Sequence, residues 1–434
     1  MHNFPAKIIL VLFFSLSINL AFSQANTNEP YSRYGFGILE PNYFGQSRTM
    51  GGVSAGMRED NTINIANPAS YPSIRITTLE SGFQASFISL RGNFNNEKSS
   101  NAQYSYLALG FPLSNKWSMV LAIVPYSKVG YTQSLIGTAP FLGPTTTTYS
   151  GEGGLTQAFM GHGFYLAKNL SIGLNLGYVF GNIQSSQSLG FKNAIGNGSD
   201  TIYNGRNTST TQLGGFNFEY GAQYTLPIQK DSRITIGYTG SYGNPLNTQV
   251  KSYLSRYSSN SRGNEVILDT TASTLDIPKP SFLPNRNAFG LSYRFRNKLL
   301  VAADFDYDIY KQVIYDGTNP KFNNLLKGAI GIQYTPDLTS VSNYWDLIDY
   351  RAGFAYTKTN LVVNQKQINQ YAITFGFGVP LRQYTQNQLG AKVNIGFEIG
   401  ELGTINANNI LQKYVNVHIG FVLNQLWFNR YRYQ

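Results

Sequence analysis

The sequence has no cysteine and few charged residues. Its 434 residues include 0 Cys and 3 His, and only 13% are Asp, Glu, Lys or Arg. Without cysteine, the chain has no disulfide, no thiolate nucleophile and no cysteine-ligated metal. An average soluble domain has about 25% charged residues. The composition therefore argues against a large surface covered with Lys and Glu.

The sequence also lacks a basic stripe. The formal net charge is +11, but the Lys and Arg residues are scattered along the chain. Nucleic-acid binding requires basic residues clustered on one face. Contact with lipid phosphates, or solubility of loops, explains the excess of positive charge at least as well. We expect membrane lipid among the partners and no nucleic acid.

Long apolar runs are absent beyond the first residues. Lys7 precedes an apolar stretch, Ile8–Phe22, that ends in the small-x-small sequence Ala21-Phe22-Ser23. This pattern is typical of an export signal, so we expect residues 1–23 to be removed and the mature chain to begin at Gln24. No later run approaches the roughly 18–20 residues that a membrane helix needs. The sequence predicts an exported protein without a transmembrane helix.

Aromatic and glycine-rich segments with a period of two fill most of the chain. In "SIGLNLGYVFG", Ile172, Leu174 and Leu176 alternate with small or polar residues. The segments "NQYAITFGFGV" and "AKVNIGFEIG" repeat the pattern. A period of two is typical of β-strands with one apolar face.

We expect about fourteen such strands, an even number within the usual range for membrane barrels. The expected strands start near Ser81, Ala102, Trp117, Leu155, Leu170, Gln212, Arg233, Asn287, Leu299, Leu325, Tyr350, Ile368, Leu389 and Tyr414. Short connections such as 114–116 and 296–298 alternate with long polar stretches such as 132–150 and 250–282. Outer-membrane barrels have short periplasmic turns and long extracellular loops. The connection 335–349 is long on the expected periplasmic side, where a short helix would account for it.

A soluble β-sandwich is the alternative all-β fold, because its strands also alternate. The continuous aromatic face and the scarcity of charge favour the membrane barrel. Aromatic residues also lie near the expected strand ends, as in the girdles of membrane barrels: Tyr165, Tyr178, Phe180, Tyr293, Phe295, Tyr307 and Tyr356. The predicted fold is an all-β transmembrane antiparallel barrel in the outer membrane, with both termini periplasmic.

Residues 24–78 have no strand or helix period, yet "INIANPASYPSIRI" (residues 63–76) is apolar. Irregular backbone is tolerated at membrane depth only inside protein or in a wet cavity. We therefore expect residues 24–78 to form a plug in the lumen and residues 79–434 to form the barrel. Asn67 is suited to capping the turn that follows it, near the periplasmic mouth.

The order of these features resembles a known family. An export signal, the stretch "RTMGGVSAGMREDNTINIANPASY", about fourteen strands and the ending "NQLWFNRYRYQ" look like the outer-membrane hydrophobic-compound transporters of the FadL-like (OMPP1/FadL/TodX) type. Asn67, Pro68 and Ala69 match the family's Asn-Pro-Ala motif. The resemblance implies passive uptake of fatty-acid-like molecules, with a gap in the third strand. A sister branch of this family serves as accessory barrels of a secretion system.

Several charged residues are expected to face the lumen. Asp304, Asp306 and Asp308 alternate with the outward Phe305 and Tyr307. Clustered carboxylates suggest acid–base chemistry or a metal, but Arg294 and Lys327 on the neighbouring strands favour an ion-pair ladder. Glu398, Lys392 and Arg351 are further inward charges of this kind.

No catalytic constellation is present in the sequence. His162 and His418 have no Ser or Asp partner at a recognisable spacing, and no cofactor or metal motif occurs. We expect the protein not to be an enzyme and to use no cofactor or metal.

The segment "WSMVLAIVPYSKV" is apolar on both faces and contains Pro125. Proline cannot donate to a strand ladder, so we expect a bulge or kink here. The inward set is a candidate ligand path: Val120, Ala122, Val124 and Tyr126. The other interpretation of this set is packing against the plug.

Two functions remain open. The first is a channel for passive uptake of hydrophobic small molecules, with lateral exit beside Pro125. The second is a non-transporting accessory barrel that docks a secretion or surface-assembly machine, and so binds other outer-membrane or secretion proteins. A continuous apolar tunnel would favour the first function, and a fully plugged lumen with large ordered outer loops would favour the second.

Overall fold

The structure is a computed structural model that describes residues 28–92, 96–191, 203–229, 231–259, 265–381, 390–405 and 409–425. The expected signal at residues 1–23 and most of the ending "NQLWFNRYRYQ" lie outside these residues. Strands β2 to β17 form the wall. They are β2 (Thr77–Arg91), β3 (Asn96–Ser114), β4 (Trp117–Ala139), β5 (Gly143–Tyr165), β6 (Leu170–Phe191), β7 (Asn204–Gln229), β8 (Ser232–Ser241), β9 (Pro245–Ser259), β10 (Glu265–Phe282), β11 (Arg286–Phe295), β12 (Leu299–Asp308), β13 (Leu325–Tyr334), β14 (Asp349–Val363), β15 (Lys366–Leu381), β16 (Ala391–Gly403) and β17 (Leu411–Gln425).

The wall is a closed antiparallel barrel with fourteen strand positions. β17 pairs with β2, which closes the sheet. β8 and β9 both pair with β7, at its lower and upper parts, and so occupy one position. β10 and β11 occupy the next position, because β10 pairs with β9 and β11 pairs with β8. The predicted strand number is confirmed.

Lipid and lumen explain the alternation along each strand. The outward Leu174 is 48% exposed on the isolated chain, whereas its inward neighbours Ser171 and Asn175 are fully buried. A bilayer can cover such an apolar outer face, and a closed sheet pairs backbone groups between neighbouring strands. The protein is therefore an outer-membrane β-barrel.

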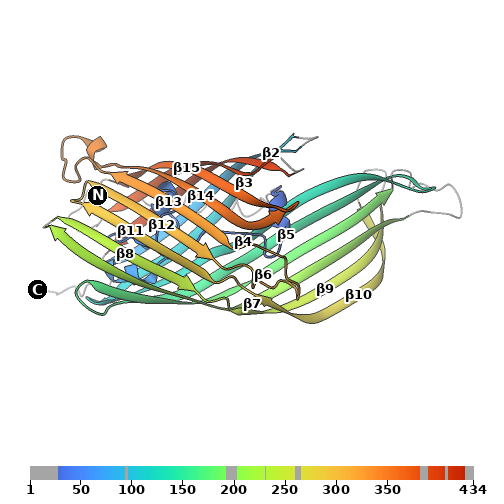
Figure 1. Cartoon of the computed structure of the whole chain (residues 1–434), viewed down its shortest axis with the longest axis horizontal. Coiled ribbons are helices and arrows are strands. Elements are labelled where there is room, and N and C mark those ends of the chain that lie inside the picture. Colours follow the sequence, from blue (N-terminus) through green and yellow to red (C-terminus); the bar gives the residue numbers. More distant parts are fainter. Residues whose placement is uncertain are drawn as a thin grey trace, which may run out of the picture.

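One part of the wall reaches far beyond the rest. β4 to β7 have 22 to 26 residues, whereas β11, β12 and β13 each have 10. Figure 1 shows these long strands, with β9 and β10, continuing on the right-hand side of the view. The predicted loops at 132–150 and 250–282 are wrong, because most of their residues belong to β4, β5, β9 and β10. Above the membrane both faces of these strands meet water, so the alternation fades while backbone pairing continues.

In the described part of the chain, no helix is long and apolar enough to cross a membrane. The long connection between β13 and β14 contains a 3-10 helix, η4 (Tyr344–Leu347). Asn343 caps it, because its side chain accepts a hydrogen bond from the Trp345 N–H at 3.3 Å.

Residues 28–76 run down the inside of the barrel. They contain η1 (Pro30–Arg33), β1 (Ile38–Leu39), η2 (Ser47–Thr49) and η3 (Pro68–Ser73). Asn28 bonds to Ser99 and Glu97, in the half of β3 nearest its extracellular end. The segment therefore enters at the extracellular half and reaches the periplasmic mouth before β2 begins. The expectation that it starts on the periplasmic side is wrong for the described residues, because it descends through the lumen.

Candidate functional site

The N-terminal segment (residues 28–76) is seated on glycines of the wall. A Cβ atom at Gly331 would lie 2.4 Å from the Met50 carbonyl oxygen, and one at Gly353 would lie 2.2 Å from the Gly51 nitrogen. At Gly237 the corresponding distance to the Ala55 carbonyl oxygen is 1.9 Å. Distances this short leave no room for a side chain. The glycines on the inward face therefore allow direct contact between the backbone of the segment and the wall.

The Asn67-Pro68-Ala69 motif lies at the periplasmic mouth. The Asn67 Oδ1 atom accepts a hydrogen bond from the Ala69 N–H at 3.1 Å, which caps η3. The Asn67 amide also donates to the Ala55 carbonyl at 2.7 Å. Pro68 packs on Gly173, near the start of β6. The motif thus ties two turns of the N-terminal segment together against the wall.

The inward carboxylates of β12 differ in their contacts, and Asp304 holds the N-terminal segment. The Asp304 Oδ2 atom accepts hydrogen bonds from the Ser54 N–H at 2.5 Å and the Ala55 N–H at 2.7 Å. Asp306 pairs with Lys327 on β13 at 3.4 Å. Asp308 accepts a long hydrogen bond, 3.4 Å, from the Asn287 N–H. Of these three carboxylates, only Asp306 forms an ion pair between neighbouring strands among the described residues.

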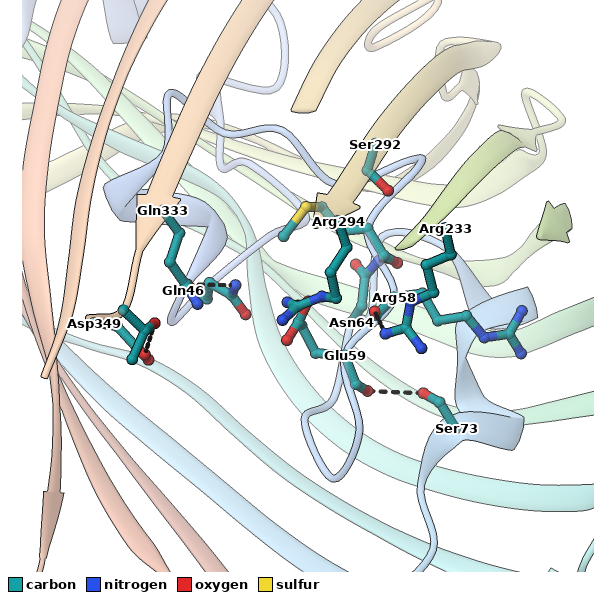
Figure 2. A network of polar contacts seen from close by, with 12 residues as sticks. Gln46, Arg58, Glu59, Asn64, Ser73, Arg233, Ser292, Arg294, Gln333 and Asp349 are labelled. Carbon is teal, nitrogen blue, oxygen red and sulfur yellow. Dashed lines mark hydrogen bonds and ion pairs between the residues drawn. The ribbon is translucent and has the colours of Figure 1, made fainter. Parts of the chain in front are cut away.

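Arg294 on β11 turns to the N-terminal segment, where it forms an ion pair with Glu59. Figure 2 shows this pair beside Arg58, whose carbonyl oxygen accepts a hydrogen bond from Arg233 at 3.1 Å. The Ser73 hydroxyl donates to the Glu59 carbonyl at 2.8 Å. The inward arginines near the mouth therefore bind the segment.

Sequence reasoning missed several anchors of the same segment. Glu80 on β2 is fully buried and accepts a hydrogen bond from the Ile63 N–H at 2.8 Å. Gln46 donates to Gln333 at 2.8 Å, and Gln333 also accepts from Arg351 at 2.7 Å. The expected inward charges Arg351 and Lys392 both pair with Asp349 of the wall, each at 2.7 Å. Glu398, the third expected inward charge, accepts a hydrogen bond from the Tyr414 hydroxyl of the wall at 3.0 Å. An isolated Glu in an otherwise alternating strand was the available signal for Glu80.

The candidate ligand path on β4 packs against the segment. Val120, Ala122 and Val124 are buried in one apolar cluster with these residues of the segment: Phe44, Ile63, Ile65, Tyr71 and Ile74. The pairing of β4 with β5 shifts register between Pro125 and Ser127. The Arg286 guanidinium lies 5.2 Å from the centre of the Tyr126 ring. The apolar inner face of β4 is therefore covered over its length up to Val124.

The wall separates between β3 and β4. These strands pair only from Leu107 opposite Ile123 to Ser114 opposite Trp117. Beyond that point the residues 28–40, here called the N-terminal strap, lie between them. The Glu40 N–H donates to the Tyr126 carbonyl at 3.0 Å, and the Glu40 carboxylate accepts from Gln103 on β3 at 3.1 Å. The strap bridges the separation.

Tyr31 fixes the upper part of the strap. Its hydroxyl donates to the Ile410 carbonyl at 2.5 Å, in the connection between β16 and β17. Burial raises the pKa of Tyr31 to about 12. The phenol stays protonated at any physiological pH and keeps this donor.

A charged cavity of about 290 Å³ remains in the lumen. Residues of both signs line it, including Glu40, Arg48, Arg286 and Asp308. Lys128 pairs with Glu29 at 2.6 Å, and Arg48 pairs with Glu40 at 3.7 Å. Apolar side chains such as Ile38, Leu325 and Leu402 also line the cavity, so it presents charged and apolar groups together.

The burial of the segment makes a labelling prediction. Ala69 is fully buried and Ile136 is 82% exposed. Since the chain has no natural cysteine, Ala69→Cys and Ile136→Cys each give one thiol. We expect a bulky maleimide to label Ile136→Cys at least tenfold faster than Ala69→Cys in intact membranes. Equal rates would contradict the burial of the motif.

Several solved structures share this fold. A FadL homologue from Pseudomonas aeruginosa has a TM-score of 0.56 and 12% identity, over 90% of this chain and 99% of that one. The toluene transporter TodX from P. putida has a TM-score of 0.57 and 14% identity, over 89% and 100%. The toluene transporter TbuX from Ralstonia pickettii has a TM-score of 0.50 and 13% identity, over 89% and 99%. The predicted FadL-like fold is confirmed.

The comparison with curated proteins gives no match. The family model described as BamG matches residues 6–434. Because this match spans nearly the whole sequence, the chain belongs to the BamG family.

Proposed function

We propose that this protein is a non-transporting accessory barrel that docks an assembly or secretion machine in the outer membrane. The observation that carries the proposal is the packing of the N-terminal segment inside the lumen. The segment contacts the wall from Gly173 on β6 to Gly353 on β14. What remains is a cavity that charged side chains of both signs line together with apolar ones. A channel for hydrophobic molecules would need a continuous apolar path, and the β4 surface that offered one is packed against the segment.

Two further features support docking. The name of the BamG family points to association with outer-membrane assembly machinery. The long strands β4 to β7, with β9 and β10, also raise a structured wall above the membrane on one side of the barrel (Figure 1). Such a wall offers a rigid surface to partner proteins outside the cell, as the second of the two functions requires.

Depletion of the protein tests the proposal. We expect the amounts of other outer-membrane or surface proteins to fall, because the assembly machine loses a component. We expect uptake of long-chain fatty acids and toluene to stay within twofold of normal. A selective loss of uptake, with unchanged levels of the other membrane proteins, would contradict the docking function.

A hydrophobic-compound channel is the second candidate function. The separation between β3 and β4 favours it, because the N-terminal strap alone bridges the described edges there. Movement of the strap would open a side exit to lipid. A ligand with ten buried methylenes would keep about 8 kcal/mol of apolar burial by avoiding water.

A reversible lock tests this second function. Leu39 and Ser127 are opposite each other in the β1–β4 pairing. The neighbouring pair, Glu40 and Tyr126, forms a hydrogen bond, so Leu39 and Ser127 form the closer type of pair, which suits a disulfide. If the strap gates uptake, the oxidised Leu39→Cys/Ser127→Cys variant will lose at least tenfold in uptake and recover on reduction. If uptake is the same under oxidising and reducing conditions, a side exit gated by the strap is ruled out. Each single-cysteine variant is the control.

A further inference from the structure

Among the described residues, β10 and β4 both have a strand edge on the extracellular part of the wall, and these two edges differ in protection. The edge of β10 carries Pro278, Lys279 and Pro280, and its pairing with β9 shifts register at three places. Prolines, charges and bulges are the features by which sheet edges avoid pairing with other chains. The β10 edge is therefore guarded against the addition of another strand.

The upper edge of β4 has none of these features. Residues Thr132–Ala139 contain no proline and no charge. On one side they pair regularly with β5, from Thr132 opposite Ser150 to Ala139 opposite Gly143. On the other side the structure gives them no strand partner among the described residues. Leu135 and Ile136 are 65% and 82% exposed. A regularly paired, uncharged edge with exposed apolar side chains is a template for pairing.

The same edge is already paired just below. The strap adds Ile38 and Leu39 to β4 opposite Lys128 and Ser127. Higher up, the Gly130 carbonyl accepts from the Glu29 N–H at 2.7 Å, and the Thr132 N–H donates to the Asn28 side chain at 3.1 Å. The strap side thus uses backbone groups of the even-numbered residues. Backbone groups of alternate residues point to the same edge of a strand, so the N–H and C=O groups of Ser134, Ile136 and Thr138 point to the strap side as well.

A second copy of the chain does not fit this edge. Two copies in one membrane have the same orientation, so their β4 strands would run parallel. A twofold axis along the membrane normal would then set like backbone groups against each other, whereas parallel pairing needs donors opposite acceptors. Antiparallel pairing of the two edges would require one copy to be inverted in the membrane. The geometry therefore excludes a second copy as the occupant.

We propose that an extended segment of a partner protein pairs with β4 along Thr132–Ala139 and adds a strand to the extracellular wall. Main-chain hydrogen bonds at Ser134, Ile136 and Thr138 would supply affinity, and the side chains on the two faces would supply specificity. Leu135 and Ile136 lie on opposite faces, so the partner segment carries apolar residues at adjacent positions and few charges. This proposal rests on the docking function and names its surface.

Purification of the tagged protein from native outer membranes tests the proposed pairing at the β4 edge. Ile136→Pro removes one N–H on the open side and leaves the groups that face β5. We expect recovery of the complex to fall at least tenfold, while heat-modifiable migration shows an intact barrel. Ile136→Lys should have the same effect. Ile267→Lys is the matched control on the guarded β10 edge, where Ile267 is 65% exposed, and it should stay within twofold of wild type.

The outcomes separate the two proposals. A wild-type barrel that purifies alone overturns the docking function and the edge together. If the complex is recovered with both Ile136 variants, the proposed pairing at the β4 edge is overturned and the docking function is not. If the variants do not fold, hydrogen exchange still tests the proposed pairing, because this measurement uses the wild-type complex. We expect exchange of the Ser134, Ile136 and Thr138 amides to slow at least tenfold relative to the isolated barrel, and unchanged exchange overturns the edge.

Discussion

Gly331→Leu is expected to drive the N-terminal segment off the wall. The new side chain would start 2.4 Å from the Met50 carbonyl oxygen, and Met50 is fully buried in the cluster below it. Overpacking of this kind costs about 1–3 kcal/mol, and displacement adds the lost burial of Met50, about 2 kcal/mol. Trypsin should then cleave after Arg48 and Arg58, which are 8% and 6% exposed in the native barrel.

Gly328→Leu is the control on the same strand. Within the described residues, nothing lies within 4 Å of a Cβ atom at this position. Its leucine would add apolar surface without touching the segment, so tryptic resistance should match that of wild type. If Gly331→Leu is equally resistant, the segment does not rest on β13 as described.

Asp304→Ala should produce the second large effect. The carboxylate is 6% exposed and accepts two backbone hydrogen bonds, from Ser54 and Ala55. Its loss leaves two buried N–H groups without their acceptor, at about 1–3 kcal/mol each. We expect the free energy of unfolding to fall by about 2–5 kcal/mol. Urea denaturation in detergent, followed by tryptophan fluorescence, measures the change.

Asp306→Ala, two residues away on the same strand, provides the comparison. Its carboxylate lies at the cavity and pairs with Lys327 at 3.4 Å. Lys327 keeps hydrogen-bond acceptors in Tyr43 and Gly52 after the change. The loss should stay within about 1 kcal/mol, as for partly solvated ion pairs. Equal losses in the two variants would contradict a special role of Asp304 in holding the segment.

The membrane part of the wall was predictable because lipid imposes one rule on every strand. Ile172, Leu174 and Leu176 must face lipid, so the period of two survives in the sequence. The upper parts of β4 and β5 escaped prediction, since water covers both faces there. Thr145–Thr148 and the neighbouring Tyr149 are good strand formers, and this β-propensity was the remaining signal.

The course of the N-terminal segment was only partly predictable. Its apolar and irregular sequence required burial. The direction in which the segment runs along the barrel axis could not be predicted from "INIANPASYPSIRI". The inward placement of Asp304 and Arg294 followed from alternation. Their partners did not, because Asp304 bonds to backbone N–H groups, which any residue supplies. The sequence did not show that inward glycines allow the backbone of the segment to contact the wall. The three-dimensional contacts of Gly331 and Gly353 showed it.

The composition of the particle released from native outer membranes by mild detergent tests the docking function most directly. The account predicts that the tagged barrel elutes in a stoichiometric complex with other outer-membrane proteins, identified by mass spectrometry. It also predicts that the particle has more than twice the protein mass of one barrel. Recovery of the barrel only as a single chain, with hydrophobic ligand in its lumen, would contradict the account and favour the channel.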